Sequence, residues 1–428
     1  MKKLLIISFI GLLLGLTYFV SREQFTLLIV LFTIAFVVME MMKRLSFSLK
    51  EVFWIGLICR LLCMFEIPML SDDYFRFLWD GSMTMNGVSP FECQPEVYID
   101  KFVHSSYLKE LYNGMNSKAY FSVYPPLNQL IFYLANLISG SNVLGGVIVI
   151  RIFLLVSEIL LFKGLVKLLQ SLKLDTSLVV YYFLNPMIIM ELFVNVHMES
   201  IMLAGFVWMV IFLFRKQYLI AALAFFISVN GKLHTLMFIP LLLSFIPFKQ
   251  FLKFILVFGF LLMMSFLPFI NLELIQNMQS SFTLYFQSFE FNASLFYLIR
   301  EVGFSVLAYD VIKTVGPILS FLSVLTILIV SWKKRGVEMK DFVWRSMVIF
   351  LVFLLFSTTV HPWYVSLALL LGLLNNFRSM VLWSLLILLT YATYLSDVYK
   401  ENLYLVLLEY LTVGVVLLVE IRAKLISK

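Results

Sequence analysis

The sequence predicts an all-α membrane protein whose chain crosses the bilayer many times. Of its 428 residues, 62% are hydrophobic and only 13% are charged, whereas a soluble globular domain is about half apolar and a quarter charged. Apolar runs long enough to cross a hydrocarbon core of about 30 Å recur from one end of the chain to the other. No polar stretch is long enough to form a soluble domain, so we expect residues 1–428 to form one integral membrane domain.

The positive charges indicate how the chain is oriented. The net charge is +7, but Lys and Arg occur in small groups between apolar runs, a pattern that excludes a nucleic-acid-binding surface. In membrane proteins such groups mark the cytoplasmic loops. Lys2 and Lys3 precede the first apolar run, and Lys43, Arg44 and Lys50 follow the second. The third span therefore runs outward and leads into a first external loop of about residues 71–142.

The segment Ser122–Gly140 has two interpretations. As a span, it would place Lys163, Lys167 and Lys173 outside. As a helix lying in the outer interface, it leaves these lysines inside, which the charge rule favours. Tyr124-Pro125-Pro126 suits a helix start, because proline is tolerated in the first turn and holds the preceding residue extended.

The remaining runs alternate regularly across the membrane. They predict both termini inside and a second external segment of about residues 271–310, with a further interfacial helix near residues 294–303. Most Lys and Arg then fall on the cytoplasmic side, including Lys333-Lys334-Arg335. The predicted bundle has about fourteen spans, at residues 4–20, 25–42, 52–70, 143–166, 177–194, 199–214, 218–231, 234–247, 252–270, 310–331, 342–360, 363–375, 380–396 and 403–420.

This topology brings four groups of polar residues to the outer ends of spans. Ionisable groups at membrane depth are costly, so such a gathering on one side predicts a functional site. Taken singly, each group has a simpler explanation, because span ends are where polar residues cost least. The groups are Asp72, Asp73, Arg76 and Asp80; Asn195, His197 and Glu199; Lys232 and His234; and His361, Trp363 and Tyr364.

The first group follows the third span directly. Ser71, Asp72 and Asp73 precede a helix-like run, so capping of that helix competes with a catalytic or metal-binding role. We expect Asp72 to be the cap. Asp73, Arg76 and Asp80 recur at offsets of three and seven and share one helix face, although Arg76 and Asp80 also suit an ordinary surface ion pair. A general base must reach a substrate hydroxyl, and Asp73 is the better candidate.

The other groups are interpreted by their spacing. Asn195, His197 and Glu199 could form half of a metal site, although a lone histidine at a span end is more often interfacial. Lys232 lies between two short spans, which suits a break directed at an anionic ligand. The motif beginning at His361 also suits an aromatic belt.

Within the spans, Arg151 and Glu158 lie seven apart on one helix face, which favours an internal ion pair. Arg151 lies closer to the outer end and could instead help to hold a phosphate.

Several of these stretches resemble the motifs of one enzyme superfamily. Asp73-Tyr-Phe-Arg76-Phe-Leu-Trp-Asp80-Gly81, followed by Asn86-Gly-Val-Ser-Pro90, resembles the D-x-Y-R-Y-L-W-D-G…N-P-Y run of bacterial polyprenol-phosphate-dependent glycosyltransferases of the GT-C superfamily. Further matches keep the family order, from Asp73 to Tyr364. They are Tyr124-Pro-Pro-Leu127 to Y-P-P-L, Asn185-Pro186 with Asn195-Val-His197-Met-Glu199 to N-P…N-G-H-N-D, and Lys232 with His361-Pro-Trp-Tyr364 to T-K-L-Y and H-P-W-Y. The sequence departs from the pattern at Ser89-Pro-Phe, Val196, Met198 and Asn230-Gly-Lys.

The resemblance implies a GT-C-like bundle with interfacial helices in the first external loop. It implies transfer of a sugar, mannose by likeness alone, from a polyprenyl-phosphate carrier to a hydroxyl of a glycan or glycolipid acceptor at the external face, with inversion. Asp73 matches the acidic residue proposed as base, and Glu199 matches the family's Asp. The substrate-binding residues implied around them are Arg76, Asp80, Arg151, Asn195, His197, Lys232, His361, Trp363 and Tyr364.

The chemistry suits these residue types. A carrier-bound sugar is already activated, so the enzyme must deprotonate a hydroxyl and stabilise a departing phosphate. No cofactor is certain. Asp73 and Glu199 could hold a divalent metal such as Mg²⁺ or Mn²⁺, although the superfamily includes members without that need.

Two other classes of protein compete with the enzyme. A transporter or flippase of lipid-linked glycans needs polar residues through the whole membrane depth, and these cluster at one face. A non-enzymatic subunit of an envelope assembly predicts no convergent cleft. The enzyme reading places the chain in a bacterial inner membrane, surrounded by membrane lipid, with its site facing outside.

Overall fold

The computed structural model describes residues 1–102, 104–287, 289–307, 311–332, 338–395 and 400–426. Within these ranges the regular structure is helical, and the one isolated β-bridge joins Phe291 to Thr359. The prediction of an all-α protein is confirmed. The basic group at residues 333–335 and the predicted end of a span at residue 396 lie outside the described residues.

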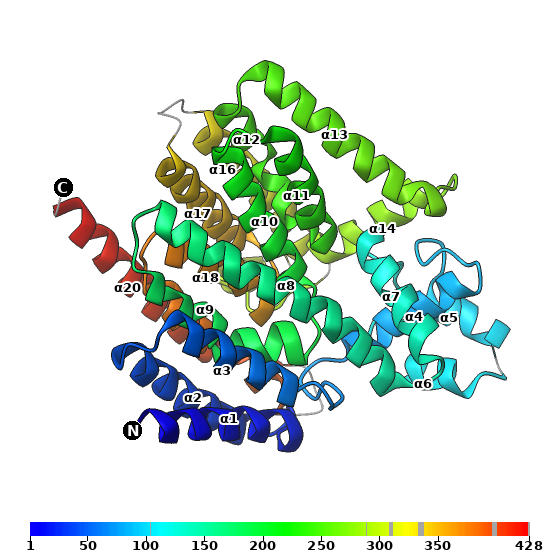
Figure 1. Ribbon diagram of the computed structural model, residues 1–428. Coiled ribbons are helices and arrows are strands. Elements are labelled where there is room, and N and C mark those ends of the chain that lie inside the picture. The colour runs from blue at the N-terminus through cyan, green and yellow to red at the C-terminus, as the bar shows by residue number, and fades with distance from the viewer. Residues whose placement is uncertain (103, 288, 308–310, 333–337, 396–399, 427–428) are drawn as a thin grey trace.

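The helices form one bundle with a smaller group of helices at one end (Figure 1). The smaller group comprises α4 (Asp73–Met85), α5 (Pro95–Tyr98), η1 (Ile99–Phe102), α6 (Ser106–Gly114) and α7 (Pro126–Ser139). The bundle comprises α1 (Lys2–Phe19), α2 (Phe25–Arg44), α3 (Leu49–Leu62), α8 (Val143–Ser171), η2 (Thr176–Val179), α9 (Val180–Phe183), η3 (Ile188–Val194), α10 (Glu199–Phe214), α11 (Tyr218–Gly231), η4 (Leu233–Phe238), α12 (Ile239–Phe245), α13 (Phe248–Phe266), η5 (Leu267–Phe269), α14 (Leu274–Gln287), α15 (Leu295–Leu307), α16 (Ile312–Trp332), α17 (Met339–Phe356), η6 (Pro362–Tyr364), α18 (Val365–Leu374), α19 (Ser379–Leu386), η7 (Ile387–Tyr394) and α20 (Leu403–Ile426).

By length and composition, six of the described helices can cross a membrane. They are α1, α2, α8, α13 continued by η5, α16 and α20. A seventh candidate is the pair Thr176–Phe183 and Ile188–Val194, which bends by 59° at Asn185-Pro186. Other predicted spans coincide with shorter apolar helices, such as α10 and α11. The protein is therefore an integral membrane protein with several membrane helices, and the count of fourteen stays a prediction.

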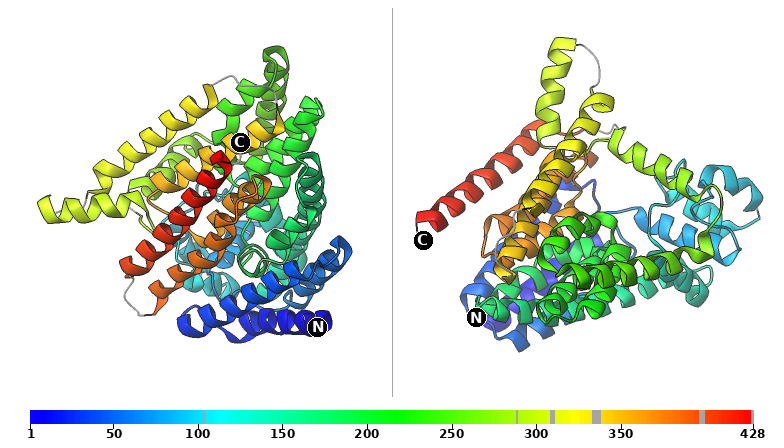
Figure 2. Two further views of the ribbon diagram at one scale, coloured as in Figure 1. Left: turned by 90° about the vertical axis from the view of Figure 1, so that its left-hand side faces the viewer. Right: turned by 90° about the horizontal axis from the view of Figure 1, so that it is seen from above.

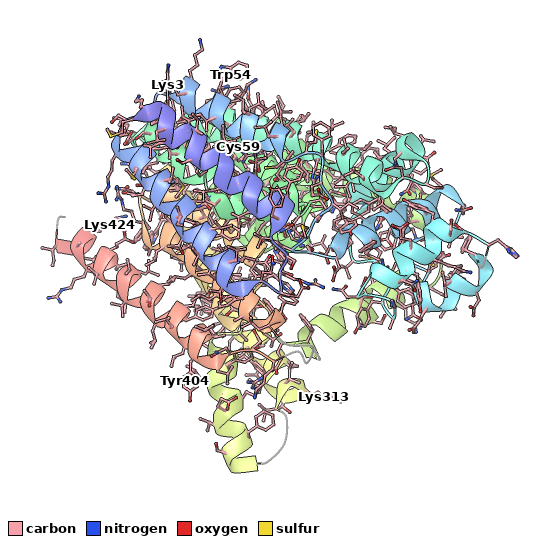
Figure 3. All side chains as sticks on the ribbon, turned by 90° about the horizontal axis from the view of Figure 1, so that it is seen from below. Lys3, Trp54, Cys59, Lys313, Tyr404 and Lys424 are labelled. Atoms are coloured by element: carbon pink, nitrogen blue, oxygen red, sulfur yellow. The ribbon has the colours of Figure 1, made fainter. Side chains whose placement is uncertain are left out.

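The two termini lie at one end of the bundle, and α4–α7 lie at the opposite end, as both directions of view show (Figures 1 and 2). Lys3 and Lys424, near the two termini, lie toward the end away from α4–α7 (Figure 3). The two chain ends thus lie at the same end of the bundle, and the prediction that both are cytoplasmic stays a prediction.

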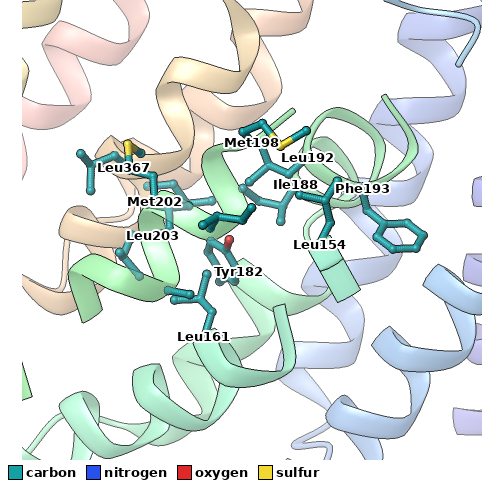
Figure 4. Close-up of a cluster of buried hydrophobic side chains, with 14 of the residues drawn as sticks. Leu154, Leu161, Tyr182, Ile188, Leu192, Phe193, Met198, Met202, Leu203 and Leu367 are labelled. Carbon is teal, nitrogen blue, oxygen red and sulfur yellow. The ribbon is translucent and has the colours of Figure 1, made fainter. Parts of the chain in front are cut away.

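The centre of the bundle is a packed apolar cluster. Side chains from α8, the bent segment and α10 meet there, among them Leu154, Tyr182, Ile188 and Met202 (Figure 4). All four are at most 1% exposed. Dense packing of this kind holds membrane helices together, since lipid tails are as apolar as the side chains.

A buried ion pair crosses the same region. The guanidinium of Arg60 on α3 lies 2.8 Å from Glu158 on α8, and both side chains are fully buried. Hydroxyls of Tyr182 and Ser200 also donate to Glu158, at 3.1 and 2.7 Å. The expected pairing of Glu158 with Arg151 on its own helix is therefore wrong. The helix packing brings Arg60 closer, and three donors satisfy one carboxylate.

Helix α7 packs tightly on α4 within the smaller group. A Cβ on Gly81 would lie 2.1 Å from the backbone oxygen of Phe132, so glycine permits this close approach. Asn136 on α7 donates to the backbone oxygen of Leu78 at 2.9 Å and accepts from the hydroxyl of Ser82 at 2.9 Å. The predicted helix after Pro125 is thus present, and its inner face fixes α4.

Residues 271–310 contain two described helices. The predicted helix near residues 294–303 corresponds to α15, and α14 was not expected from the sequence. Asn277 on α14 donates to the backbone oxygen of Phe91 at 3.1 Å, and Ser281 donates to that of Phe121 at 3.3 Å. These bonds attach α14 to the loop that holds α4–α7.

Candidate active site

Asp73 begins α4 immediately after the third apolar segment. Its backbone N–H donates to the hydroxyl oxygen of Ser71 at 3.3 Å. Asp72 occupies the cap position but its side chain makes no capping hydrogen bond. It pairs instead with Arg22, at 2.7 Å. The expectation that Asp72 caps the helix is therefore wrong, because a cation from the turn between α1 and α2 lies within its reach.

His197 faces Asp73 across the site. Nε2 of His197 lies 3.7 Å from Oδ2 of Asp73 and 3.3 Å from the hydroxyl of Ser71. Nδ1 lies 2.8 Å from the backbone oxygen of Glu191. A carbonyl oxygen can only accept, so Nδ1 carries the hydrogen, and the lone pair of Nε2 faces the hydroxyl of Ser71 and, farther away, the carboxyl of Asp73. Burial, aided by the charge of Lys232, lowers the pKa of His197 and keeps the ring neutral.

Glu191 lies in a π-helical turn, η3, which follows the bend at Asn185-Pro186. Its carboxylate accepts from the hydroxyl of Tyr391 at 2.6 Å and from the amide of Asn195 at 3.4 Å. The turn then reverses at Val196, whose φ is 57°. That left-handed conformation is strained for a β-branched residue. π-Turns and strained backbone of this kind concentrate at functional sites.

The carboxyl of Asp73 has an unusual pKa. Burial raises the pKa of Asp73 to about 6, with Asp72 and Glu199 adding to the rise and Lys232 and Tyr124 opposing it. The hydroxyl of Tyr124 donates to Oδ2 at 3.4 Å. The side chain is nevertheless 26% exposed, so a ligand can reach it. A carboxyl that titrates near neutral pH suits a general base.

Lys232 is held at the end of α11. A Cβ on Gly231 would lie 2.4 Å from the backbone nitrogen of Met202, so the chain passes very close to α10 there. Asn128 donates to the backbone oxygen of Gly231 at 3.0 Å. The ammonium of Lys232 lies 3.0 Å from a carboxylate oxygen of Glu199, which is 1% exposed. The cation also lies 5.9 and 5.4 Å from the ring centroids of Tyr124 and Tyr364.

An aromatic stack crosses the site. The rings of His197 and Trp363 are 3.7 Å apart, those of Trp363 and His361 are 4.5 Å apart, and those of His361 and Phe291 are 4.7 Å apart, all nearly parallel. The bridge between Phe291 and Thr359 brings the last ring into place. Burial, aided by Lys232, lowers the pKa of His361 to about 3. The stack is therefore an uncharged aromatic wall.

A polar cavity of about 450 Å³ lies along this wall. Asp73, Arg76, His361 and Trp363 all line it. Three buried donors there, Nη2 of Arg76, Oγ of Ser117 and Nε1 of Trp363, have no hydrogen-bond partner among the described residues. Unpaired buried donors cost free energy unless a ligand or water accepts from them. This cavity, which we call the polar cavity, therefore offers hydrogen-bond donors suited to hydroxyl or phosphate oxygens.

A second, mostly apolar cavity of about 360 Å³ lies beyond Tyr124. Val123 and Tyr124 line both cavities. Lys232, His234 and Tyr364 line its polar part, and Ile327 of α16 and Phe353 of α17 belong to its apolar wall. This apolar cavity therefore runs from a cation toward two hydrophobic helices.

The remaining predicted site residues hold the framework. Arg76 lies 2.7 Å from Asp80, and it donates to the backbone oxygens of Ser117 and Tyr120 at 2.9 and 2.8 Å. This pair is buried, so the interpretation of a surface ion pair is wrong. Arg151 is fully buried and donates to the backbone oxygens of Met64, Glu66, Phe193 and Val194. It joins the end of α3 to η3.

Sequence reasoning missed several residues of the site. Glu191 is an isolated carboxylate in the apolar run from Asn185 to Val194, and that isolation was the available signal. Arg22 is the only arginine in the turn between α1 and α2, and it lines the polar cavity. Tyr391 and Tyr394 also line that cavity, but aromatic residues in an apolar helix carry no signal of their own.

The sequence predicted that Asp73 and Glu199 could hold a divalent metal ion. No group of three or more His, Cys, Asp or Glu side chains suited to a metal ion occurs among the described residues. Glu199 pairs with Lys232. Binding of Mg²⁺ or Mn²⁺ by Asp73 and Glu199 stays a prediction.

The chain was compared with family models, curated proteins and solved structures. Neither the curated proteins nor the solved structures contain a significant match to this chain. A family model described as alpha-(1->6)-mannopyranosyltransferase, N-terminal domain, matches residues 9–247, more than half of the 428-residue chain. The matched region holds Asp73, His197 and Lys232. The chain therefore belongs to the MptA/B family of alpha-(1->6)-mannopyranosyltransferases, which are membrane hexosyltransferases of the GT-C type.

Proposed function

We propose that this protein transfers mannose from a polyprenyl-phosphate carrier to a hydroxyl of a glycan or glycolipid acceptor, with inversion and with Asp73 as general base. One observation carries the proposal. Asp73 lines a polar cavity that meets an apolar cavity at Tyr124, and Lys232 lies at the head of the apolar cavity. Base and cation thus face one junction from two sides.

The apolar cavity suits the lipid donor. Its wall of α16 and α17 side chains fits a polyprenyl chain, since a chain of this kind gains by leaving water. Lys232 at its polar end supplies a positive charge to the carrier phosphate. Cation and apolar groove thus occupy the two ends of one cavity, as the two parts of the donor require.

The polar cavity suits the acceptor. Its volume of about 450 Å³ lies within the usual range of about 300–1,000 Å³ for small-molecule sites. Nη2 of Arg76 and Nε1 of Trp363 offer donors to sugar hydroxyls. The faces of Trp363 and His361 offer an apolar surface to the C–H face of a sugar ring. Charged and aromatic groups together favour a glycan acceptor.

The reaction needs one proton transfer and one displacement. Asp73 takes the proton of the acceptor hydroxyl while the acceptor oxygen forms its bond to the anomeric carbon. The bond from that carbon to the phosphate oxygen breaks on the opposite face, and polyprenyl phosphate leaves with its negative charge near Lys232. Single displacement inverts the anomeric carbon. A base with a pKa near the working pH is most effective in such a step.

His197 supports the base rather than replacing it. Its neutral Nε2 lies 3.7 Å from Oδ2 of Asp73 and accepts a hydrogen bond once Asp73 is protonated. Catalytic contacts of this length commonly shorten when substrate binds. The backbone oxygen of Glu191 holds the ring from behind, Asn195 donates to the carboxylate of Glu191, and Glu199 holds Lys232. We assign Arg151 a positioning role, because its bonds go to backbone oxygens.

The orientation follows from the predicted topology. The segments that line the polar cavity, including the turn at Arg22 and the motif at His361, all belong to predicted external ends. We infer a GT-C-like bundle of about fourteen spans in a bacterial inner membrane, with the site facing outside. The short apolar helices α10, α11 and α18 then cross as parts of the bundle.

The test is transfer by purified protein in detergent, with mannosyl polyprenyl phosphate and a mannan-type acceptor. Asp73→Asn should lose about 10²–10⁴ of its rate, the range for loss of a general base. The matched control is Asp100→Asn, because Asp100 is an exposed residue of the same loop, and it should keep full activity. Full activity of Asp73→Asn would refute the assignment. The alternative hypothesis of a flippase instead predicts that the lipid carrier moves across the membrane of vesicles without formation of a glycosidic bond.

A further inference from the structure

A second polar cluster lies away from the candidate active site. It joins the segment around Asn292 to α19 and to the beginning of α20. The backbone N–H of Asn292 donates to Glu401 at 2.7 Å, and its side-chain amide donates to Oε1 of Glu409 at 3.2 Å. The indole of Trp383 donates to the same Oε1 at 2.7 Å. Two carboxylates thus converge on one asparagine.

This cluster surrounds a small cavity. Asn292, Glu401 and Glu409 line one part of it, and Thr390 and Thr393 of η7 belong to the other wall. Its volume is about 10 Å³, about that of a single water molecule or monatomic ion. No organic ligand fits there.

Two oxygen atoms of the cluster lack partners. Oδ1 of Asn292 and Oε2 of Glu409 are buried and accept no hydrogen bond within the described ranges. Both residues are fully buried. No ion pair links Glu401 or Glu409 to a Lys or Arg of the described chain, since nearby Arg300 pairs with Glu290 and Glu301. Buried charges without a counter-charge are costly.

We propose that this cavity is a binding site for a hard divalent cation of the size of Ca²⁺, held by Oδ1 of Asn292, Oε2 of Glu409 and the carboxylate of Glu401. The ligand set is all oxygen, which suits Ca²⁺. Two carboxylates balance a double positive charge. Three side chains leave room for backbone oxygens or water in the flexible coordination that Ca²⁺ accepts. Mg²⁺ requires a stricter octahedron and keeps its own waters.

The cation would stabilise the position of one wall of the polar cavity. Asn292 follows Phe291, which stacks on His361, and Thr390 lines both cavities. The hydroxyl of Tyr410 on α20 also donates to the backbone oxygen of Asn292, at 2.8 Å. An ion here would tie α20 and η7 to the segment that holds the aromatic wall. This role is separate from any metal at Asp73 and Glu199.

Trp383 provides a direct optical test on the full-length protein in detergent. Tb³⁺ binds the oxygen ligands of Ca²⁺ and emits light when an adjacent tryptophan transfers energy to it. We expect emission from the wild type that Ca²⁺ displaces. Emission should fall several-fold in Trp383→Phe, which removes the sensitiser, and in Glu409→Gln, which removes a ligand. Emission that is unchanged in Trp383→Phe, or that Ca²⁺ does not displace, would overturn the proposal.

Thermal unfolding gives a second readout. Ca²⁺ should raise the midpoint of the wild type and of the control Glu110→Gln, an exposed residue, more than the same concentration of Mg²⁺ does. Glu401→Gln, a milder change than Glu409→Gln, should reduce that increase. The rival explanation is a protonated Glu409 that shares its proton with the amide of Asn292. In that case the wild-type midpoint would not respond to Ca²⁺ at neutral pH, and the cation site would be refuted.

Discussion

Nε2 of His197 lies 3.7 Å from Oδ2 of Asp73, although the two residues come from different segments of the chain. The carbonyl of Glu191 fixes the hydrogen of His197 on Nδ1, so a lone pair faces the carboxyl. This geometry stabilises Asp73 in its protonated form, which is the form that a general base has after it has acted. The prediction for His197→Phe below depends on this relationship.

The rate should depend on pH through Asp73. Burial raises the pKa of this carboxyl to about 6, and only the ionised form can accept a proton. At pH values above about 6 the carboxyl of Asp73 is ionised and can accept a proton. Below that pH, kcat/KM should fall about tenfold per pH unit. A pH profile of kcat/KM from pH 4.5 to 8 measures this decrease on the acid side, which we call the acid limb. A profile that is flat to pH 4.5 would contradict the assignment.

His197→Phe should move the acid limb to lower pH. Phenylalanine keeps a ring to stack on Trp363 but offers no lone pair to protonated Asp73, so the pKa of Asp73 falls. A hydrogen bond to such a group is worth about 1.5 kcal/mol or more, so we expect a loss of about tenfold or more in kcat. Trp363→Phe, which keeps His197, is the matched control and should leave the acid limb in place.

Lys232→Met should move the acid limb in the opposite direction. The charge of Lys232 lowers the pKa of Asp73, so removal of that charge raises the pKa and shifts the limb to higher pH. We also expect a loss of about 10²-fold or more in kcat, because the leaving phosphate loses its cation. The exposed Lys163→Met is the control. Shifts of the same sign in His197→Phe and Lys232→Met would show that these roles are wrong.

Lys232→Met should also lower stability by about 3–5 kcal/mol, since it leaves the buried Glu199 without its counter-charge. The double variant Lys232→Met with Glu199→Gln removes both charges. It should recover most of the thermal unfolding midpoint but none of the transfer activity. Recovery of activity in the double variant would mean that Lys232 acts only on Glu199.

Val196→Gly should lower stability by less than removal of a fully buried valine side chain normally does. Val196 is fully buried, but its φ of 57° is strained, and glycine relieves about 1–3 kcal/mol of that strain. Val194→Gly is the matched control, because Val194 is equally buried and ends the helical turn without a positive φ. Thermal unfolding should show a smaller fall for Val196→Gly. An equal or larger fall would mean that the backbone there is relaxed.

The left-handed backbone at Val196 bears on one departure from the family pattern. The related motif has glycine where this chain has valine. A left-handed turn is needed there to direct His197 toward Asp73, and glycine adopts it without strain. The motif resemblance supplies the glycine, and the backbone conformation supplies the physical reason for it.

The sequence alone determined the class of fold, and it identified polar groups that the structure places along the polar cavity. Composition predicted membrane helices, and Tyr124-Pro125-Pro126 predicted the start of α7. Charge distribution predicted that both termini are cytoplasmic, and in the structure they lie at the same end of the bundle (Figure 1). Each of these features depends on residues close together in the chain, or on totals over long stretches. Such information is present in the sequence before any packing occurs.

Only the tertiary structure decided which polar groups meet. Glu158 pairs with Arg60 on another helix and not with Arg151 on its own, and Asp72 pairs with Arg22 instead of capping α4. The 59° bend at Asn185-Pro186 brings Glu191 behind His197. These partners depend on crossing angles and bends summed over many residues. The local pattern around each residue is compatible with several partners, and the packing of the whole bundle selects one.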